Sequence, residues 1–219
     1  MGYLYPQDEK FHFRYHDLLK ATPGSVKRWV MERYGEIPAF DGEHTRFGSD
    51  RHEMFEQEMK KTRRLPSVFL NECKALPAHY KDIGIEMVEE EIVTEIFPNV
   101  VLHSRPDAVS KSYGLIADPK ITVDQIKKWN PSRQLLMYVL HFMARNIPIK
   151  EICYLGEIWD FDEVPNNGKM MKVKRDIIDY QCLIKPVDEE EVMTIKNEWA
   201  RPRIEYLMAA LELYKSGEL

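Results

Sequence analysis

Two aspartates and a lysine in the middle of the chain form the pattern with the clearest chemical meaning. Asp107 ends a strand-like run, and Asp118-Pro119-Lys120 lies eleven residues further on, in the next strand-like run YGLIADPKIT. Two strands joined by a short turn lie side by side, so both carboxylates can converge at one sheet edge. Adjacent carboxylates repel, and each resists ionisation unless a cation is present. Oxygen ligands of this kind suit Mg²⁺ or Mn²⁺.

Lys120 adds a third group to this pair. It lies two residues after Asp118, and side chains two apart on a strand share a face. An ammonium there can orient or help to deprotonate an attacking water, and can neutralise charge on a pentavalent phosphorane. Metal, water and lysine together predict phosphodiester hydrolysis. The alternative is a chance Asp-x-Lys triplet, with Asp107 forming a turn and Lys120 solvated.

The run SRQLLMYVLHFMARN predicts a helix with two unlike faces. Gln134 and Tyr138 are four residues apart and share one face, which His141 and Arg145 extend. The opposite face is apolar and is expected to pack on the sheet. The polar stripe suits a phosphate backbone or a stacked base, although an ordinary helix surface would also have this pattern.

The elements around these residues predict a mixed α/β chain. The expected helices cover residues 25–34, 50–64 (capped by Ser49), 132–146 and a final helix from Asp188 that Pro202 should bend. The expected strand-like runs are 85–97, 100–110, 113–122, 151–161 and 170–184. We predict one domain over residues 1–219, with a helical part at about 1–84, a catalytic sheet core at about 85–185 and a C-terminal helix at about 188–214.

Composition narrows the class of protein. The net charge is −5, which at first argues against a nucleic-acid partner, but it is unevenly spread. Residues 105–150 carry a net charge of +5 and residues 81–104 carry −5, so this local basic segment could still bind a polyanion.

No apolar run is long enough to span a membrane, and the start lacks the apolar core of a signal peptide. We expect a cytoplasmic protein of a bacterial or phage-infected cell.

Taken together, the motifs resemble those of the PD-(D/E)xK nuclease superfamily, and within it the RecB-like exonucleases. The family pattern begins with G-x-x-x-H-x-x-x-E, which appears here as Gly48 to Glu56 with His52 at its centre. It continues with G-x-x-D, D/E-x-K and Q-x-x-x-Y. These elements appear as Ser104 to Asp107, Asp118 to Lys120 and Gln134 to Tyr138. The match covers roughly residues 20–146 in the right order.

The resemblance implies a fold and a role for each residue. The fold would be a restriction-endonuclease-like core, a central mixed β-sheet flanked by helices, with a helical N-terminal part. His52, Asp107 and Asp118 would be metal ligands, with the carbonyl of Pro119 as a fourth. Lys120 would be the catalytic lysine, and Gln134 with Tyr138 would position DNA. Arg145, from the polar stripe of the same helix, is a further candidate for DNA contact. Glu56 either faces the site or pairs with Lys60.

The function implied is a Mg²⁺- or Mn²⁺-dependent DNA nuclease of recombination, repair or degradation, in which metal-activated water hydrolyses phosphodiester bonds. Exonuclease is favoured over endonuclease by the resemblance alone. The alternatives are an inactive DNA-binding module or a structural, partner-binding protein of the same fold.

The sequence departs from the family pattern at Ser104, which replaces the usual glycine of the family. Because Cys73, Cys153 and Cys182 are scattered, no iron–sulfur cluster is expected. The phage-type, lambda-exonuclease-like branch therefore fits better, and a homo-oligomer and a recombination partner protein are compatible with it.

Overall fold

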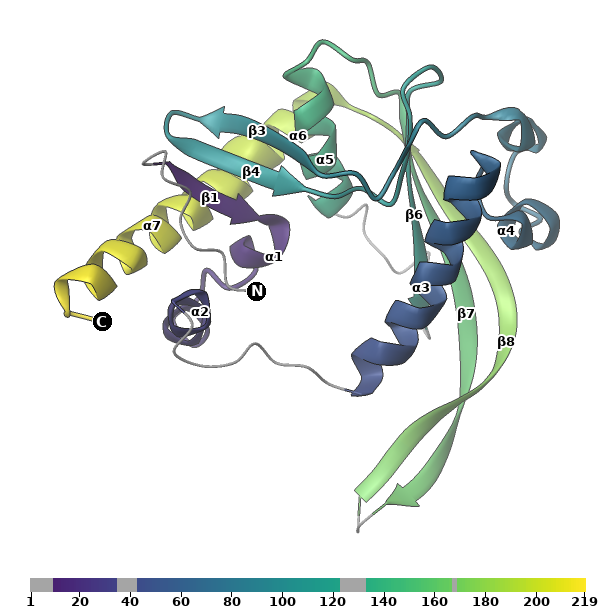
Figure 1. Cartoon of the computed structure of the whole chain (residues 1–219), viewed down its shortest axis with the longest axis horizontal. Helices are drawn as coiled ribbons and strands as arrows, with labels where there is room; N and C mark the ends of the chain where they lie inside the picture. The colour runs from purple at the N-terminus through teal and green to yellow at the C-terminus, as the bar shows by residue number, and fades with distance from the viewer. Residues whose placement is uncertain (1–9, 35–42, 123–132, 167–168) are drawn as a thin grey trace.

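Two mixed β-sheets with helices around them make up the part of the chain that the computed structural model describes, residues 10–34, 43–122, 133–166 and 169–219 (Figure 1). The larger sheet has the strand order β2-β5-β6-β7-β8, and the smaller has the order β1-β4-β3. The strands are β1 Phe11–Arg14, β2 Met87–Val88, β3 Ile92–Phe97, β4 Val100–Ser104, β5 Ala108–Ser110, β6 Leu115–Thr122, β7 Glu151–Asn166 and β8 Lys169–Pro186. The expected α/β class is confirmed, although the mixed sheet is divided into two.

Strand β1 was not expected, because the N-terminal part of the chain was predicted to be helical. It pairs in parallel with β4 and completes the smaller sheet. The helical segments are α1 Tyr15–Leu18, α2 Val26–Arg33, α3 Glu43–Thr62, α4 Ser67–Glu72, the 3₁₀ turn η1 Ala78–Asp82, α5 Arg133–Met143, α6 Glu189–Thr194 and α7 Arg201–Ser216. The helix starts expected near Asn130 and Pro131 lie outside the described residues.

The hairpin of β5 and β6 sets the register of the candidate site. Ala108 pairs with Ala117 and Ser110 with Leu115 in antiparallel fashion. Continuing this register by one residue places Asp107 opposite Asp118. The turn requires Gly114, whose φ is +88°, because a Cβ there would lie 2.9 Å from the carbonyl oxygen of Pro148. The close pairing of the two aspartates therefore depends on a glycine turn.

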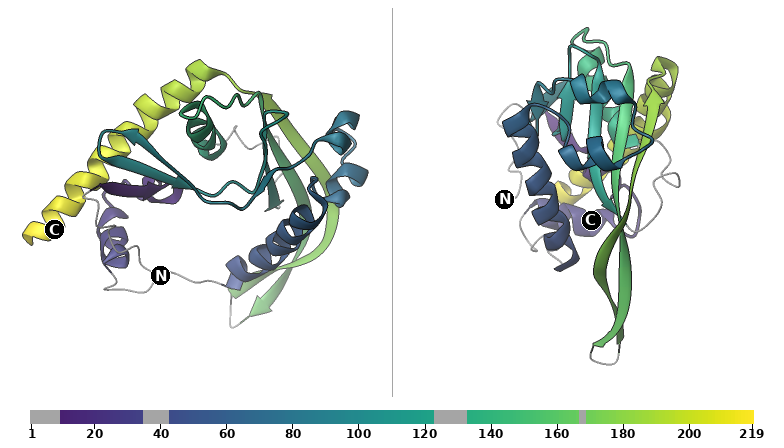
Figure 2. Two further views of the ribbon diagram at one scale, coloured as in Figure 1. Left: turned by 45° about the horizontal axis from the view of Figure 1, so that its top comes forward. Right: turned by 90° about the vertical axis from the view of Figure 1, so that its right-hand side faces the viewer.

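The larger sheet is covered on both faces, and side chains alternate between them. One face packs against α3 and α4 and includes Ala117, Cys153 and Leu155. The other face packs against α5 and the C-terminal helices and includes Ile116, Ile152 and Tyr154. By this alternation Asp118 and Lys120 belong to the α5 face, whereas Glu157 belongs to the α3 face. The views in Figure 2 show α3 running along β6 and β7.

Helix α3 begins earlier than the sequence predicted. The helix was expected at residues 50–64 with Ser49 as its cap, but it starts at Glu43 and Ser49 lies inside it. It ends at Thr62, and Arg63 follows with a left-handed φ of 55°. Its buried side chains, Phe55 and Met59, are four residues apart and face the sheet. The early start places His52 in the middle of the helix and not in its first turn.

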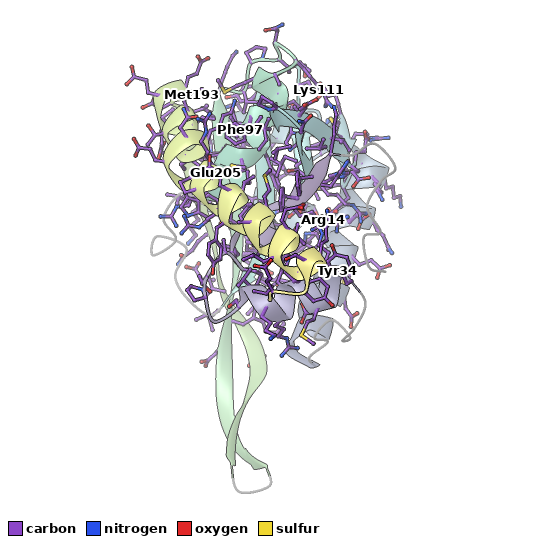
Figure 3. The ribbon with its side chains drawn as sticks, turned by 90° about the vertical axis from the view of Figure 1, so that its left-hand side faces the viewer. Arg14, Tyr34, Phe97, Lys111, Met193 and Glu205 are labelled. Atoms are coloured by element: carbon purple, nitrogen blue, oxygen red, sulfur yellow. The ribbon has the colours of Figure 1, made fainter. Side chains whose placement is uncertain are left out.

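The C-terminal helix contains a π-helical turn just before its internal proline, Pro202. Asp188 caps α6 by accepting a hydrogen bond from the amide of Glu190. A π-helical turn, Ile195–Ala200, then precedes α7, which has Pro202 in its first turn. Proline lacks an amide hydrogen, and the wider turn accommodates the break. Figure 3 shows Tyr34 beside the end of α7, where its ring stacks on Tyr214 with centroids 4.8 Å apart.

Strands β7 and β8 are longer than expected and form a hairpin that extends away from the rest of the chain (Figures 1 and 2). Asn166 pairs with Lys169 near its tip, and Glu151 with Pro186 at its base. The sequence had predicted strands that stop at 161 and restart at 170. Among the helices of the described ranges, none is long and apolar enough to cross a membrane.

We predict that Gly114→Ala lowers the free energy of unfolding by about 1–3 kcal/mol, because alanine at this left-handed φ is strained and its Cβ meets the backbone of Pro148. The matched control is Gly84→Ala, since nothing lies within 4 Å of a Cβ built at that position. Urea unfolding of both variants measures the difference. Equal stability of the two variants would show that the turn does not need glycine.

Candidate active site

The two aspartates of the central pattern lie together where β5 begins. Asp107 is 7% exposed and Asp118 is 1% exposed. Beyond Ala117, the described part of β6 pairs with β7 alone, so this stretch is open on the β5 side. That opening accommodates Pro119, whose missing amide hydrogen would disrupt a ladder with strands on both sides. Burial, and then the nearby charge of Asp107, raise the pKa of Asp118 well above its usual range.

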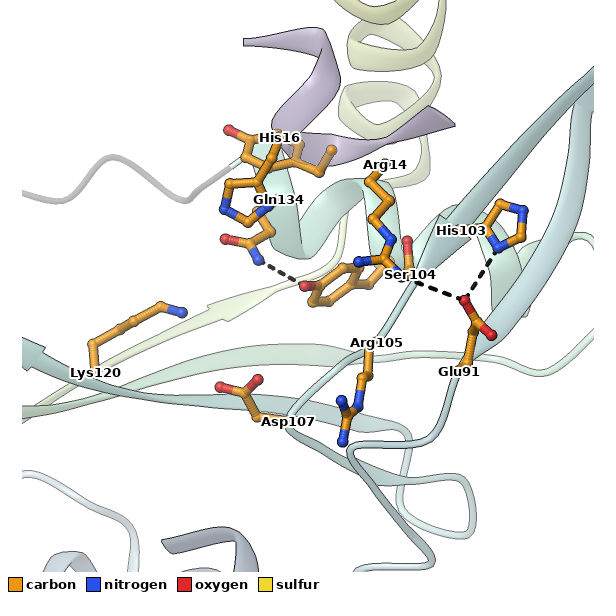
Figure 4. Close-up of a pocket in the computed structure, with 11 residues that line it drawn as sticks. Arg14, His16, Glu91, His103, Ser104, Arg105, Asp107, Lys120 and Gln134 are labelled. Carbon is orange, nitrogen blue, oxygen red and sulfur yellow. Dashed lines mark hydrogen bonds and ion pairs between the residues drawn. The ribbon is translucent and has the colours of Figure 1, made fainter. Parts of the chain in front are cut away.

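Lys120 lies against the same carboxylate. Its Nζ is 2.6 Å from Oδ1 of Asp118. Burial acts to lower the pKa of Lys120, but the charges of Asp118 and then Asp107 outweigh it and raise that pKa above its ordinary value. The lysine is therefore an ammonium at neutral pH. It faces a pocket rather than bulk solvent, as Figure 4 shows.

Helix α3 brings His52 to the aspartates from the other side. Its Nε2 is 2.9 Å from Oδ2 of Asp107 and 3.5 Å from Oε1 of Glu89. The interaction with Asp107 raises the pKa of His52, and partial burial opposes it. The structure thus brings His52, Asp107, Asp118 and Lys120 together, in the arrangement that the resemblance implied. Their roles as ligands and as catalytic groups stay predictions.

Glu89 is a site residue that the sequence reasoning missed. Its side chain is 9% exposed and, with His52 and Glu56, it offers ligand atoms within 4.8 Å of one another. Its φ is +53°, and its amide donates to the carbonyl oxygens of Pro106 and Asp107. This left-handed backbone after β2 turns Glu89 towards Asp107. In the sequence, the run Glu89-Glu90-Glu91 within the acidic segment 81–104 is the signal that could have indicated this residue.

Glu56 is arranged for either of the two roles left open by the sequence. It pairs with Lys60 one turn further along α3, and it also belongs to the group with His52 and Glu89. Arg105 lies over these acids, with its Nε 2.8 Å from Oε2 of Glu89 and an Nη 3.7 Å from Oε1 of Glu56. A guanidinium therefore partly neutralises the acidic cluster at its open side.

The donor set fits a divalent cation. Within the described residues, Oδ2 of Asp107 and both carboxylate oxygens of Asp118 are buried and accept no hydrogen bond. His52 and Lys120 approach as ion pairs, but these contacts fall short of hydrogen-bond geometry. Buried acceptors without donors are costly. A cation bound between them would satisfy these oxygens, and hard oxygen ligands with one imidazole suit Mg²⁺ or Mn²⁺.

Helix α5 contributes the amide and phenol of the predicted stripe. Nε2 of Gln134 donates to the Tyr138 hydroxyl over 2.6 Å. Burial is the main cause that raises the pKa of Tyr138, so its hydroxyl stays protonated. Gln134 and Tyr138 line the pocket, whereas Arg145 lies at the far end of the helix and donates to the carbonyl of Val93 over 3.1 Å.

His141 does not belong to the polar stripe, which corrects the expectation for this helix. It is fully buried and bonds to Thr94 at 2.8 Å and to Ser104 at 2.7 Å. These contacts join α5 to β3 and β4 of the smaller sheet. They also give a local reason for Ser104 in place of the family glycine, because the hydroxyl pairs with the buried imidazole.

A pocket of about 310 Å³ opens over these groups, and Figure 4 shows the side chains that line it. Asp107 and Lys120 lie on one side of it, and Gln134 and His16 on the other. The lining residues are Arg14, Tyr15, His16, Glu91, His103, Ser104, Arg105, Asp107, Lys120, Gln134 and Tyr138. Burial, and then the charge of Lys120, lower the pKa of His16. Arg14, Arg105 and Lys120 place positive charges around the pocket beside the carboxylates of Glu91 and Asp107.

Comparison with solved structures gives two similar folds. A phage-related exonuclease from Haemophilus somnus 129PT has a TM-score of 0.56 at 12% identity, covering 96% of this chain and 97% of its own. LHK-Exo, solved in complex with dAMP, has a TM-score of 0.52 at 10% identity, covering 95% of this chain and 93% of its own. No protein-family model and no curated sequence matches this chain. The chain has a lambda-exonuclease-like nuclease fold.

We predict that His141 makes stability fall with decreasing pH. Burial lowers its pKa from 6.5 to about 3 in the folded protein. The unfolded chain therefore binds a proton first as the pH falls below about 6.5. Between pH 6 and 4, His141 alone should lower the free energy of unfolding by about 1 kcal/mol for each unit by which the pH falls. Urea unfolding of wild type and His141→Gln across this range measures the contribution of His141 to the pH dependence of stability. Parallel pH profiles of the two proteins would contradict the assignment.

Proposed function

We propose that the protein is a divalent-metal-dependent DNA nuclease that hydrolyses phosphodiester bonds, with exonuclease action favoured over endonuclease action. The observation that carries the proposal is the buried pair of Asp107 and Asp118 with Lys120 beside it. This arrangement lies in a fold that the chain shares with two exonucleases. Fold alone does not define function, so the argument depends on the chemistry of the site.

Asp107 and Asp118 would hold the cation, with His52 and Glu89 as further ligand candidates. When bound, Mg²⁺ or Mn²⁺ lowers the pKa of a bound water and polarises a phosphoryl oxygen. The proposal is supported by the buried carboxylate oxygens that accept no hydrogen bond among the described residues. It is also supported by the raised pKa of Asp118, because a divalent cation beside this carboxyl group would favour its ionised form.

Lys120 has the charge of an electrostatic stabiliser. Because its pKa is raised, its ammonium keeps its proton at neutral pH. It can therefore orient a water through its N–H groups and neutralise the charge that develops on the phosphoryl oxygens. This favours orientation and charge stabilisation over proton abstraction, both of which the sequence had left open.

The pocket supports DNA as the substrate. Arg14, His16 and Arg105 place cationic or hydrogen-bonding groups around the space that faces Asp107 and Lys120. Gln134 and Tyr138 add neutral donors on the opposite wall. Phosphate oxygens are bound by groups of these types. One of the similar structures contains dAMP, a deoxynucleotide of the kind that DNA hydrolysis releases.

The test is the digestion of linear and circular DNA in Mn²⁺ by wild type, Asp118→Asn and Lys120→Met. We expect each variant to lose at least about 100-fold in rate, because Asp118→Asn weakens the binding of the cation and Lys120→Met removes the positive charge placed at the phosphoryl group. Lys111→Met is the matched control, since Lys111 lies in the exposed turn of the same hairpin. Selective digestion of linear DNA would support exonuclease action. Equal rates for wild type and the two site variants would disprove the assignment.

A further inference from the structure

A second buried acid, Glu157 on β7, lies on the face of the sheet that α3 covers. Its side chain is fully buried. Arg51 of α3 approaches it with three contacts: Nε lies 3.0 Å from each carboxylate oxygen, and an Nη lies 3.0 Å from Oε2. The indole of Trp159 donates to Oε1 over 2.9 Å. The carboxylate is therefore held by a two-pronged guanidinium and an indole, which fixes its orientation.

Stability does not explain this ion pair. Moving two charges from water into the protein interior costs about as much free energy as their attraction gains. Apolar side chains of similar volume often stabilise a core equally well. The surrounding cluster is apolar and includes Phe55, over whose ring the Arg51 guanidinium lies at 5.2 Å. What a two-pronged pair adds to such a core is a defined position and rotation of the helix.

The residue next to Arg51 on the helix is His52. Neighbouring residues on an α-helix point about 100° apart, so Arg51 can face β7 while His52 faces Asp107 across the edge of the sheet. Glu157 pairs in register with Ile121, the residue after Lys120. The pair therefore joins the helical turn that carries His52 to the strands that carry Asp118 and Lys120.

We propose that the buried Arg51–Glu157 pair is a positioning device that holds His52 against Asp107 and thereby sets the affinity of the site for its cation. In this account Arg51 and Glu157 touch neither the cation nor the substrate. They act only by fixing the rotation of α3 about its axis and its position over the sheet. The part that concerns cation affinity rests on the function proposed above. The part that concerns the contact of His52 with Asp107 is independent of it.

The first readout is the ring nitrogen chemical shifts of His52, measured by NMR in EDTA and assigned with His52→Gln. Two variants are compared with wild type. Glu157→Gln removes the charge and keeps the shape. The double variant Arg51→Met/Glu157→Leu replaces the pair by apolar side chains. It provides the test if Glu157→Gln alone does not fold. We expect the His52 signals to shift or broaden in both, because the ring loses its fixed place beside Asp107.

Tyr80→Phe is the matched control. The Tyr80 hydroxyl donates to Glu151 at the base of β7 over 2.8 Å, and Tyr80 is buried in the same cluster as Phe55. This variant removes a buried polar contact of the same strand without touching α3 near His52. Its His52 signals should match wild type. Unchanged His52 signals in both pair variants would overturn the proposal.

The second readout is Mn²⁺ binding by calorimetry. Groups that orient a metal ligand typically account for 10- to 100-fold in affinity, so we expect about a tenfold weaker affinity in the pair variants and wild-type affinity in Tyr80→Phe. Shifted His52 signals without Mn²⁺ binding by wild type would refute the proposed metal-dependent function and leave the positioning of His52 in place. Equal Mn²⁺ affinity of wild type and pair variants would overturn the role in cation affinity.

Discussion

Two carboxylates held together in a buried place are the constraint on which the rest of the site depends. The antiparallel register of β5 and β6 puts Asp107 opposite Asp118, and both side chains are buried. Burial, and then the charge of Asp107, raise the pKa of Asp118, and a buried carboxylate in this position is unfavourable unless a cation compensates. Lys120 and His52 supply part of that compensation. The remaining unsatisfied oxygens are the reason to infer a divalent ion.

The larger sheet makes this arrangement possible because helices cover both of its faces. Helix α3 reaches the aspartates from one face with His52, and α5 faces them from the other with Gln134 and Tyr138. The smaller sheet is tied to α5 by the buried His141, and its β4 leads directly to Asp107. Three separate parts of the chain therefore meet at one edge, where β5 begins.

The local features of the site could be predicted from sequence, and its long-range features could not. The spacing of Asp107, Asp118 and Lys120 defines a hairpin, so their convergence follows from strand geometry. His52 could be placed only through the resemblance, because its distance from Asp107 depends on how α3 packs. Glu89 and the Arg51–Glu157 pair depend on tertiary packing and on a left-handed backbone, which no local pattern indicates. Strand β1 was missed for the same reason, since its partner β4 is distant in sequence.

The central claim, that Asp107 and Asp118 share one divalent ion, is tested most directly by anomalous X-ray diffraction from crystals soaked in Mn²⁺. The account predicts a strong anomalous peak within coordinating distance of both carboxylates, with His52 or Glu89 beside it, and loss of that peak in Asp118→Asn. A peak bound only by Glu56 and other exposed acids, or no peak near Asp107 and Asp118, would contradict it.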